Sequence, residues 1–260
     1  MAEAPAAPAL SALSAASAAS AAPILSLDGV QTHIGPYHIL HGVSFAVPRA
    51  GVTMLLGRNG AGKTTTLRTI MNLWQASEGR IVFDGADITR RGTPAIAQAG
   101  IAYVPENMSV FSELTVAENM RLAARSGAID GQRLDWVFRM FPALKIFWHQ
   151  RAGVLSGGQK QMLSVARAII EPRKLLIVDE PTKGLAPAII QNMITVFREL
   201  KQTDVSILLV EQNFHMAKSV GDTVAVMDDG RVVHMGTMAA LAGDESLQQR
   251  LLGLSLAAHQ

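Results

Sequence analysis

The segment Gly57-Arg58-Asn59-Gly60-Ala61-Gly62-Lys63-Thr64 decides the fold of this chain of 260 residues. It stands between the compact apolar run Val52 to Leu56 and the segment Thr64 to Met71, which has the pattern of a helix. It matches G-x-x-x-x-G-K-[ST], in which glycines let backbone N–H groups converge on phosphate oxygens beside a helix N-terminus. The sequence therefore predicts a phosphate-binding loop, or P-loop, between a strand and a helix.

The roles expected within this loop follow from its chemistry. Lys63 is expected to reach the β- and γ-phosphates of a nucleotide, and the Thr64 hydroxyl to coordinate Mg²⁺. The spacing is not the G-x-G-x-x-G of dinucleotide-binding folds, so NAD is a poor rival, and a plain glycine-rich turn is the remaining alternative. The residues expected to bind nucleotide here are Gly57, Arg58, Asn59, Gly60, Ala61, Gly62, Lys63, Thr64 and Thr65.

Two adjacent carboxylates follow a second apolar run. Leu175 to Val178 has the pattern of a buried strand and continues into Asp179, Glu180 and Pro181. Because successive residues of a strand point to opposite faces, the two acids are expected to take different roles. Asp179 is expected to hold Mg²⁺, and Glu180 to polarise the attacking water as a general base. The alternative is a solvated acidic turn, which the presence of a P-loop in the same chain disfavours.

A third segment, Leu155-Ser156-Gly157-Gly158-Gln159, precedes a predicted helix from Lys160 to Ile170. Small residues at a helix start expose backbone N–H groups to an anion. The segment lies 24 residues before Glu180 (180 − 156) and resembles the signature sequence of ATP-binding-cassette (ABC) ATPases, a resemblance that covers Ile24 to about Leu252. It implies that two such subunits sandwich two ATP molecules. The residues that would contact the nucleotide on the partner's P-loop are Ser156, Gly157, Gly158 and Gln159.

The resemblance also sets the expected fold, an α/β chain with a P-loop NTPase core of ABC type, an antiparallel β subdomain and an inserted α-helical subdomain at about 107–165. Ser206 to Val210, like the run before Asp179, has the fully apolar character of a central parallel strand. Asp229-Gly230 predicts a hairpin between Thr223 to Met227 and Arg231 to Met235. We expect one ABC ATP-binding domain at 24–260, after an Ala/Ser-rich tail at 1–23 that is disordered or a frayed helix.

Composition removes several classes of function. The chain has no cysteine, which excludes disulfides and cysteine-ligated metals. Its net charge of +2 gives no argument for nucleic acid, and no nucleic-acid partner is expected. No apolar run approaches the roughly 18 to 20 residues that cross a bilayer, so a role at a membrane would depend on partner proteins. His33, His38 and His41 show no spacing that converges on a metal.

Three positions depart from the general ABC pattern. Glu106 stands where most members have Gln, Gln212 where most have a switch His, and Gly184-Leu185-Ala186-Pro187 where most have Gly-Leu-Asp. These departures, together with the run Leu114 to Asn119, resemble one branch of the family. That branch comprises the ATP-binding proteins of branched-chain amino acid importers and their urea and amide relatives.

The departures have chemical consequences, and Glu180, Gln212 and Glu106 are the expected catalytic residues. Gln212 can donate a hydrogen bond to the γ-phosphate but cannot become cationic. Glu106 would add negative charge beside Glu180 and the phosphates, which favours a sensor or coupling role. An active site with both changes is expected to hydrolyse ATP slowly alone and to depend on a partner. The position that usually carries an adenine-stacking aromatic holds Ile34. Tyr37 could stack on the base instead, or pack against its apolar neighbours.

The resemblance implies the motor of an importer, using ATP and Mg²⁺ at the cytoplasmic face of the bacterial inner membrane. Its expected partners are transmembrane permease subunits, a second ATP-binding subunit in a homo- or heterodimer and, indirectly, a periplasmic solute-binding protein. The groove between Glu106 and Met120 is the expected docking surface for a permease helix. An exporter motor is the closer rival. A soluble ABC ATPase acting on nucleic acid or ribosomes is disfavoured, because only 92 residues without sustained heptads separate Lys63 from Leu155 (155 − 63).

Overall fold

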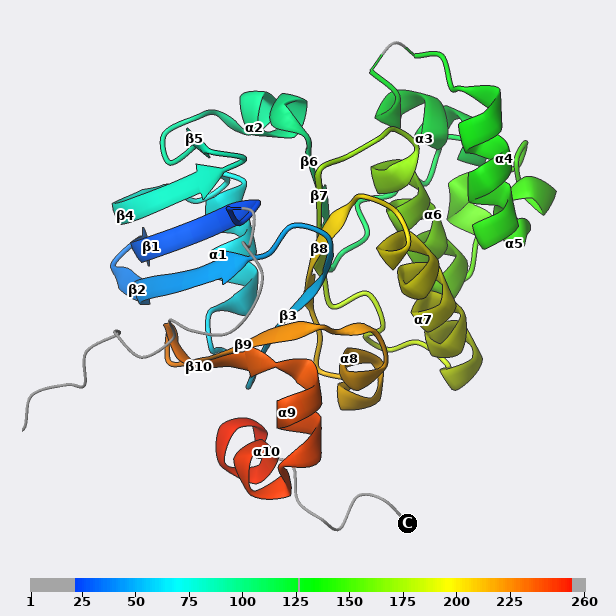
Figure 1. Ribbon diagram of the computed structural model, residues 1–260. Helices are drawn as coiled ribbons and strands as arrows, with labels where there is room; N and C mark the ends of the chain where they lie inside the picture. Colours follow the sequence, from blue (N-terminus) through cyan, green and yellow to red (C-terminus); the bar gives the residue numbers. More distant parts are fainter. Residues whose placement is uncertain (1–21, 126, 254–260) are drawn as a thin grey trace, which may run out of the picture.

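The computed structural model describes residues 22–125 and 127–253, and Figure 1 shows two sheets flanked by helices. Residues 1–21 of the predicted tail lie outside the described residues. None of the described helices combines the length and the hydropathy that a membrane-spanning segment needs.

The larger sheet has six strands in the order β10-β9-β3-β8-β7-β6. They are β3 (Gly51–Gly57), β6 (Ile101–Val104), β7 (Leu175–Asp179), β8 (Ser206–Val210), β9 (Thr223–Asp228) and β10 (Arg231–Thr237). Strands β9, β3, β8, β7 and β6 pair in parallel, whereas β10 is antiparallel to β9. Asp229 and Gly230 join β9 to β10 with φ values of 41° and 69°, and such a pair of left-handed residues is typical of a tight hairpin. The predicted central strands and the predicted hairpin are confirmed.

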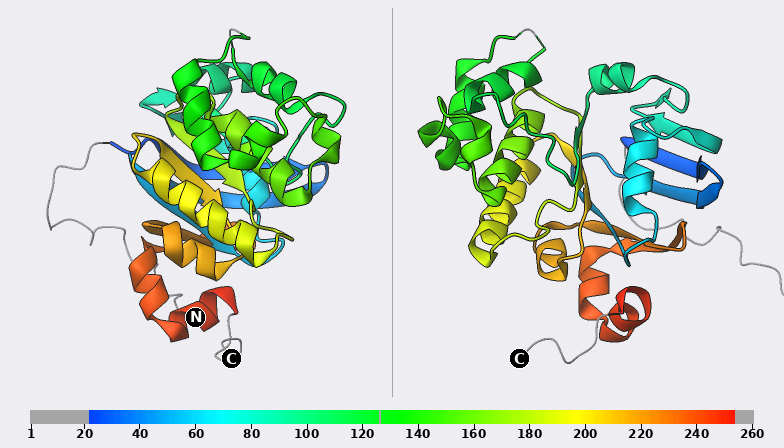
Figure 2. Two further views of the ribbon diagram at one scale, coloured as in Figure 1. Left: turned by 90° about the vertical axis from the view of Figure 1, so that its right-hand side faces the viewer. Right: turned by 180° about the vertical axis from the view of Figure 1, so that it is seen from behind.

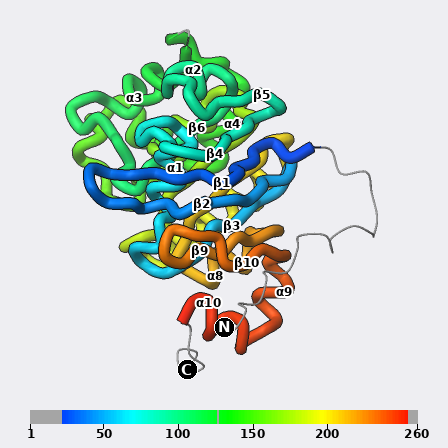
Figure 3. The backbone as a smooth tube through the Cα atoms, turned by 90° about the vertical axis from the view of Figure 1, so that its left-hand side faces the viewer, coloured from blue at the N-terminus to red at the C-terminus, as the bar shows by residue number. Residues whose placement is uncertain are grey.

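The smaller sheet is antiparallel, with the strand order β2-β1-β4-β5. It consists of β1 (Leu25–Ile34), β2 (Tyr37–Val47), β4 (Ala76–Phe83) and β5 (Ala86–Asp87). Figure 3, which looks at the molecule from this side, shows β1 and β2 running side by side in front of the rest of the chain. This sheet is the antiparallel β subdomain that the family resemblance implies.

The helices are α1 (Lys63–Ile70), α2 (Thr93–Ala99), α3 (Val116–Ala123), α4 (Gly131–Met140), α5 (Pro142–Ile146), α6 (Gly157–Ile169), α7 (Pro187–Lys201), α8 (Phe214–Val220), α9 (Met238–Gly243) and α10 (Glu245–Leu252), with a 3-10 turn at Ala152–Val154. Helices α3 to α5 fall in the stretch 107–165 that is expected to form a helical subdomain. Figures 1 and 2 show them grouped with α6, away from the antiparallel sheet. The exact limits of that subdomain stay a prediction.

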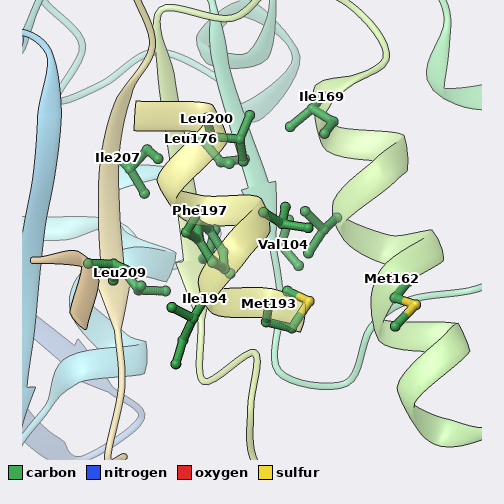
Figure 4. Close-up of a cluster of buried hydrophobic side chains, with 14 of the residues drawn as sticks. Val104, Met162, Ile169, Leu176, Met193, Ile194, Phe197, Leu200, Ile207 and Leu209 are labelled. Carbon is green, nitrogen blue, oxygen red and sulfur yellow. The ribbon is translucent and has the colours of Figure 1, made fainter. Parts of the chain in front are cut away.

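The apolar core lies on both faces of the six-stranded sheet. Ile177 and Leu208 belong to the cluster on the side of α1 and the antiparallel sheet. Their neighbours along the same strands, Leu176 and Leu209, pack in the opposite cluster with Phe197 of α7, as Figure 4 shows. Burial on both faces explains why these strands are apolar at every position. It also makes the carboxyl edge of the sheet a rigid base for the loops that follow the strands.

Candidate active site

The P-loop begins where a parallel strand ends. Strand β3 ends at Gly57, β7 at Asp179 and β8 at Val210. Because the three strands are parallel, their carboxyl ends meet at one edge of the sheet, where α/β folds bind ligands. The loops after them carry the P-loop, the acid pair and Glu211-Gln212. The sheet therefore brings together three loops that are far apart in the sequence.

The side chain of Lys63 hydrogen-bonds to the backbone of the P-loop. Gly57 opens the loop with a φ of 144°, and a Cβ at this position would lie 2.2 Å from the carbonyl oxygen of Met227. The Nζ of Lys63, the first residue of α1, donates hydrogen bonds to the carbonyl oxygens of the first two loop residues at 2.8 and 3.0 Å. Burial lowers the pKa of Lys63, while the charges of Glu180 and Asp179 oppose that shift. Phosphate oxygens can take the place of these two carbonyl oxygens beside the cation.

The residues predicted to hold Mg²⁺ lie in contact. The Thr64 hydroxyl donates to Oδ1 of Asp179 at 3.2 Å, and Oδ2 of this buried carboxylate has no hydrogen-bond partner within the described chain. Burial raises the pKa of Asp179 to about 6; the Thr64 hydrogen bond opposes the shift, and the charges of Glu180 and Glu106 add to it. A hydroxyl beside a carboxylate that keeps one oxygen free is a donor set that suits Mg²⁺.

Glu180, the predicted general base, follows β7 in a left-handed conformation with a φ of 46°. For a residue other than glycine this backbone costs about 1 to 3 kcal/mol, and such strain is concentrated at functional sites. The side chain is only 8% exposed, and its Oε1 accepts a hydrogen bond from Nε2 of Gln212 at 2.6 Å. Gln212, which is predicted to contact the γ-phosphate, therefore holds the carboxylate of the predicted base.

Glu106 also reaches this cluster, through a lysine that the sequence analysis did not single out. Nζ of Lys183 lies 2.6 Å from Oε1 of Glu106 and 3.5 Å from Oε2 of Glu180. The hydrogen bond with Glu106, and then the charge of Glu180, raise the pKa of Lys183. The sequence did carry a signal, because Lys183 is the basic residue of the short loop between β7 and α7.

Glu211 is a second residue that the sequence analysis missed. Its buried carboxylate accepts hydrogen bonds from the backbone N–H and the hydroxyl of Thr182, at 3.0 and 2.7 Å. It also accepts from the backbone N–H groups of Gln212 and Asn213, both at 3.1 Å. Burial raises the pKa of Glu211, although these hydrogen bonds oppose the shift. The carboxylate ties the loop after β7 to the loop after β8 and so sets the position of Gln212 relative to Glu180.

The signature segment forms the start of α6. Ser156 is the N-cap: its hydroxyl accepts from the backbone N–H of Gln159 at 3.3 Å, and the Gln159 side chain accepts from the backbone N–H of Ser156 at 2.9 Å. The helix therefore begins at Gly157, three residues before the predicted start. Ser156 and Gly157 are exposed, whereas Gly158 is buried against Ile189. The hydrogen bonds of the Ser156 and Gln159 side chains stay within this segment and do not join it to the P-loop cluster.

The β1–β2 hairpin carries the remaining predicted residue, Tyr37. Its side chain is 70% exposed, so it does not pack against its apolar neighbours, and stacking on adenine stays a prediction. Hairpin pairing puts His33 opposite His38, a contact between histidine rings that the sequence analysis did not predict. Their ring centroids lie 4.1 Å apart, and the ring of His41 lies 4.1 Å from that of His38. Even so, the described residues contain no group of three side chains suited to a metal ion.

Comparisons with known proteins agree with this geometry. The family model described as ABC transporter matches residues 40–183. The high-affinity branched-chain amino acid transport ATP-binding protein BraG of Pseudomonas aeruginosa is 39% identical over 232 residues, which cover 88% of this chain and 100% of BraG. The probable branched-chain amino acid transport ATP-binding protein LivF of Archaeoglobus fulgidus is 35% identical over 225 residues, which cover 84% of this chain and 93% of LivF.

A solved structure of an ATP-binding subunit of an ABC transporter has a TM-score of 0.74 and 29% identity, covering 90% of this chain and 96% of that one. The matched family region spans more than half of the chain and contains the P-loop, the signature segment and the acid pair. The parallel strand ends bring the P-loop and the acid pair together. This chain belongs to the ABC transporter family and is one of its ATP-binding, ATP-hydrolysing subunits.

Proposed function

We propose that this ATPase subunit powers the import of branched-chain amino acids, or of related small polar solutes, through membrane permeases. The observation that carries the proposal is the 39% identity to BraG along the whole length of that protein, whose name assigns it to branched-chain amino acid transport. The residues Glu106, Gln212 and Ala186, at positions where most ABC ATPases differ, support the same branch.

The proposed chemistry assigns one task to each part of the carboxyl edge. The P-loop N–H groups and Lys63 bind the phosphates of ATP, and Glu180 accepts a proton from the attacking water as the general base. Gln212 orients Glu180 through the hydrogen bond described above and donates to the γ-phosphate when ATP is present. Thr64 and Asp179 would hold Mg²⁺, which supplies positive charge that offsets the charge of the phosphates.

The exposed signature segment supports a dimer as the working form. Its helix start offers N–H groups to an anion, and Ser156 and Gly157 are accessible on the surface. In the proposed dimer this segment covers the γ-phosphate of ATP bound to the P-loop of a second ATP-binding subunit. The second subunit is either another copy of this chain or a related one.

An apolar groove beside the loop after β6 supports docking on a permease. Its lining includes Leu73, Tyr103, Pro105, Met108 and Arg167. The nearby side chains of Leu73 and Phe111 are each 50% exposed, and exposed apolar groups at a groove are typical of a protein contact. We assign this groove, which overlaps the segment from Glu106 to Met120, to a permease helix. The protein would then work at the cytoplasmic face of the bacterial inner membrane, with a periplasmic solute-binding protein as an indirect partner.

The test is to identify what the protein binds in its own host. A tagged Glu180→Gln variant would retain ATP without hydrolysing it, so mild solubilisation with ATP should preserve weakly bound partners. The Lys63→Ala variant, which loses the cation of the P-loop, is the control that cannot form the ATP-bound assembly. We expect polytopic permease subunits to accompany Glu180→Gln. Deletion of the gene should abolish uptake of labelled leucine, isoleucine or valine, and the wild-type chain should restore that uptake.

Recovery of an export machine, or normal uptake of all three amino acids and of urea in the deletion strain, would overturn the importer assignment. Recovery of ribosomal or nucleic-acid-bound proteins alone would overturn the transport assignment as a whole. In either case the ATPase chemistry of the carboxyl edge would stand, because it rests on the geometry of the site.

A further inference from the structure

Lys183 links two loops that both face the predicted reaction centre. It lies between β7 and α7, and its Nζ is 2.6 Å from Oε1 of Glu106, a residue 77 positions earlier in the loop after β6. The same nitrogen is 3.5 Å from Oε2 of Glu180. One ammonium group therefore contacts both the carboxylate that replaces the family's usual Gln and the carboxylate of the proposed base.

Folding stability is a poor explanation for this contact. The side chain of Lys183 is 59% exposed, and ion pairs at such positions contribute little to the free energy of folding. Lys174, which precedes the other end of β7, forms a similar exposed ion pair. Its side chain is 57% exposed, and its Nζ lies 2.6 Å from Oδ2 of Asp84. What distinguishes Lys183 is the set of charges around it.

Those charges include three carboxylates, and Arg68 is a further cation whose charge lowers the pKa of one of them, Asp179. Asp179, Glu180 and Glu106 cluster at the carboxyl edge, and the charge of Glu106 is one of the causes that raise the pKa of Asp179. Lys63 hydrogen-bonds the P-loop carbonyl oxygens and is assigned above to the phosphates of ATP. Within the described chain, Lys183 is the cation that forms an ion pair with Glu106. Without it, a free carboxylate would stand beside the site that must accept the phosphates of ATP.

We propose that Lys183 is a positioning residue whose charge offsets that of Glu106, so that this ATPase works with Glu in place of the family's usual Gln. The proposal rests on the proposed role of Glu180 as the general base. Negative charge spreads over the phosphoryl oxygens in the transition state of phosphoryl transfer, and an uncompensated carboxylate nearby opposes that charge. Lys183 therefore acts mainly on the rate of hydrolysis, by keeping the Glu106 carboxylate paired and away from the reacting groups.

The experiment is a double-mutant cycle on kcat and KM for ATP, measured on the full chain. Lys183→Ala should lower kcat about tenfold with little change in KM, whereas Lys183→Arg, which keeps the charge, should stay within about threefold of the wild type. Glu106→Gln should restore the loss, so that Lys183→Ala/Glu106→Gln hydrolyses ATP within about threefold of Glu106→Gln alone. Lys174→Ala is the matched control and should leave kcat unchanged.

Two results would overturn the proposal. One is a kcat for Lys183→Ala equal to that of Lys174→Ala, and the other is a loss that Glu106→Gln fails to relieve. Thermal melting of the Lys183 and Lys174 variants should agree, which separates an effect on the reaction from an effect on folding. Glu180→Gln, measured in parallel, tests the general base. If that variant hydrolysed ATP at the wild-type rate, the assignment of Glu180 as the base would be wrong. The rates of the Lys183 and Glu106 variants could still be compared with one another.

Discussion

Helices α1 and α6 both start at glycine-rich segments, but the contacts around these two helix starts differ. At α1 the P-loop encloses the ammonium of Lys63, and Gly57 is pressed against the backbone of Met227. At α6 the exposed Ser156 hydroxyl caps the helix locally. Apart from the adjoining residues and the backbone of α6 itself, no heavy atom of the described chain lies within 4 Å of the position that a Cβ on Gly157 would take. Residues of the same chain surround the start of α1, whereas the start of α6 has an open face.

This difference supports the proposal that one subunit holds half of an ATP site in each of two places. Both helix starts offer N–H groups and a partial positive charge to phosphate. Only the first also has Asp179, Glu180 and Gln212 beside it. We infer that the second is useful only against ATP bound to another subunit. Substitutions should therefore act on the first site through folding and chemistry, and on the second through association.

The largest expected effect belongs to the α1 side. Glu180→Gln removes the proposed base and should lower kcat by about 10²- to 10⁴-fold while ATP still binds. Because bound ATP then persists, the variant should accumulate as an ATP-dependent dimer in size-exclusion chromatography. Phosphate release and nucleotide binding, measured on the same sample, check the first part. A dimer that forms equally well without ATP would contradict the role proposed for the start of α6, which is contact with ATP bound to a second subunit.

Alanine at one glycine of each helix start separates folding from association. At Gly57 an alanine Cβ would overlap the Met227 carbonyl oxygen at a φ of 144°, so Gly57→Ala should lower the free energy of unfolding by about 2 to 4 kcal/mol. At Gly157 the space is open, and alanine in a helix should change that free energy by less than about 1 kcal/mol, toward greater stability.

Urea denaturation of both variants measures these changes, and the ATP-dependent dimer measured with each variant in the Glu180→Gln background completes the test. Gly157→Ala should weaken that dimer despite its normal stability, because the added methyl group lies on the face that we propose meets the partner's ATP. Equal losses of stability at the two glycines would contradict the structural difference between the helix starts.

Most of the fold was predictable from the sequence because its signals are local. The apolar runs at β7 and β8 and the turn at Asp229-Gly230 each predicted the element that the structure contains. The start of α6 was placed too late. The glycines at its first turn have low helix propensity, although Ser156 and Gln159 carried the sequence pattern of a capping box.

The site was predictable only in part, for a related reason. Motif spacing identified the P-loop and the acid pair, whose partners are set by the strand order. The roles of Glu211 and Lys183 depend on loops that meet across the sheet, 29 and 77 residues from their partners. No local pattern reports such a contact. The histidine stack was missed because it depends on the register of β1 against β2, which is shifted by irregular pairing between Thr32 and His33.

The buried carboxylate at the α1 side predicts a pH-dependent cost in stability. Folding raises the pKa of Asp179 from 3.8 to about 6, so the folded chain holds the proton more tightly than the unfolded chain. The free energy of unfolding therefore falls as the pH rises from about 4 to about 6. Asp179→Asn removes this term and should increase the free energy of unfolding of the chain without ligand by roughly 2 to 3 kcal/mol at pH 7.5.

Urea titrations at a series of pH values check this prediction. The gain of Asp179→Asn over the wild type should shrink toward zero as the pH falls below about 4, because the wild-type carboxyl then becomes protonated in both states. ATP hydrolysis should be lost in the same variant, since stability gained at an active site commonly comes with lost function. A gain that stays constant across this pH range would mean that burial of the charge is not its cause.

The smallest expected effect lies at the α6 side and is the sharpest test of its open face. Ser156→Ala removes the hydroxyl that caps α6 and should lower the free energy of unfolding by about 1 kcal/mol. Thr237→Ala is a matched control, because its hydroxyl caps α9 by accepting from the backbone N–H of Ala240 at 3.2 Å. Both variants should lose similar stability, but only Ser156→Ala should also weaken the ATP-dependent dimer and lower kcat. If both variants lower kcat equally, the hydroxyl of Ser156 serves its own helix alone, and the open face of α6 needs another explanation than a partner's phosphate.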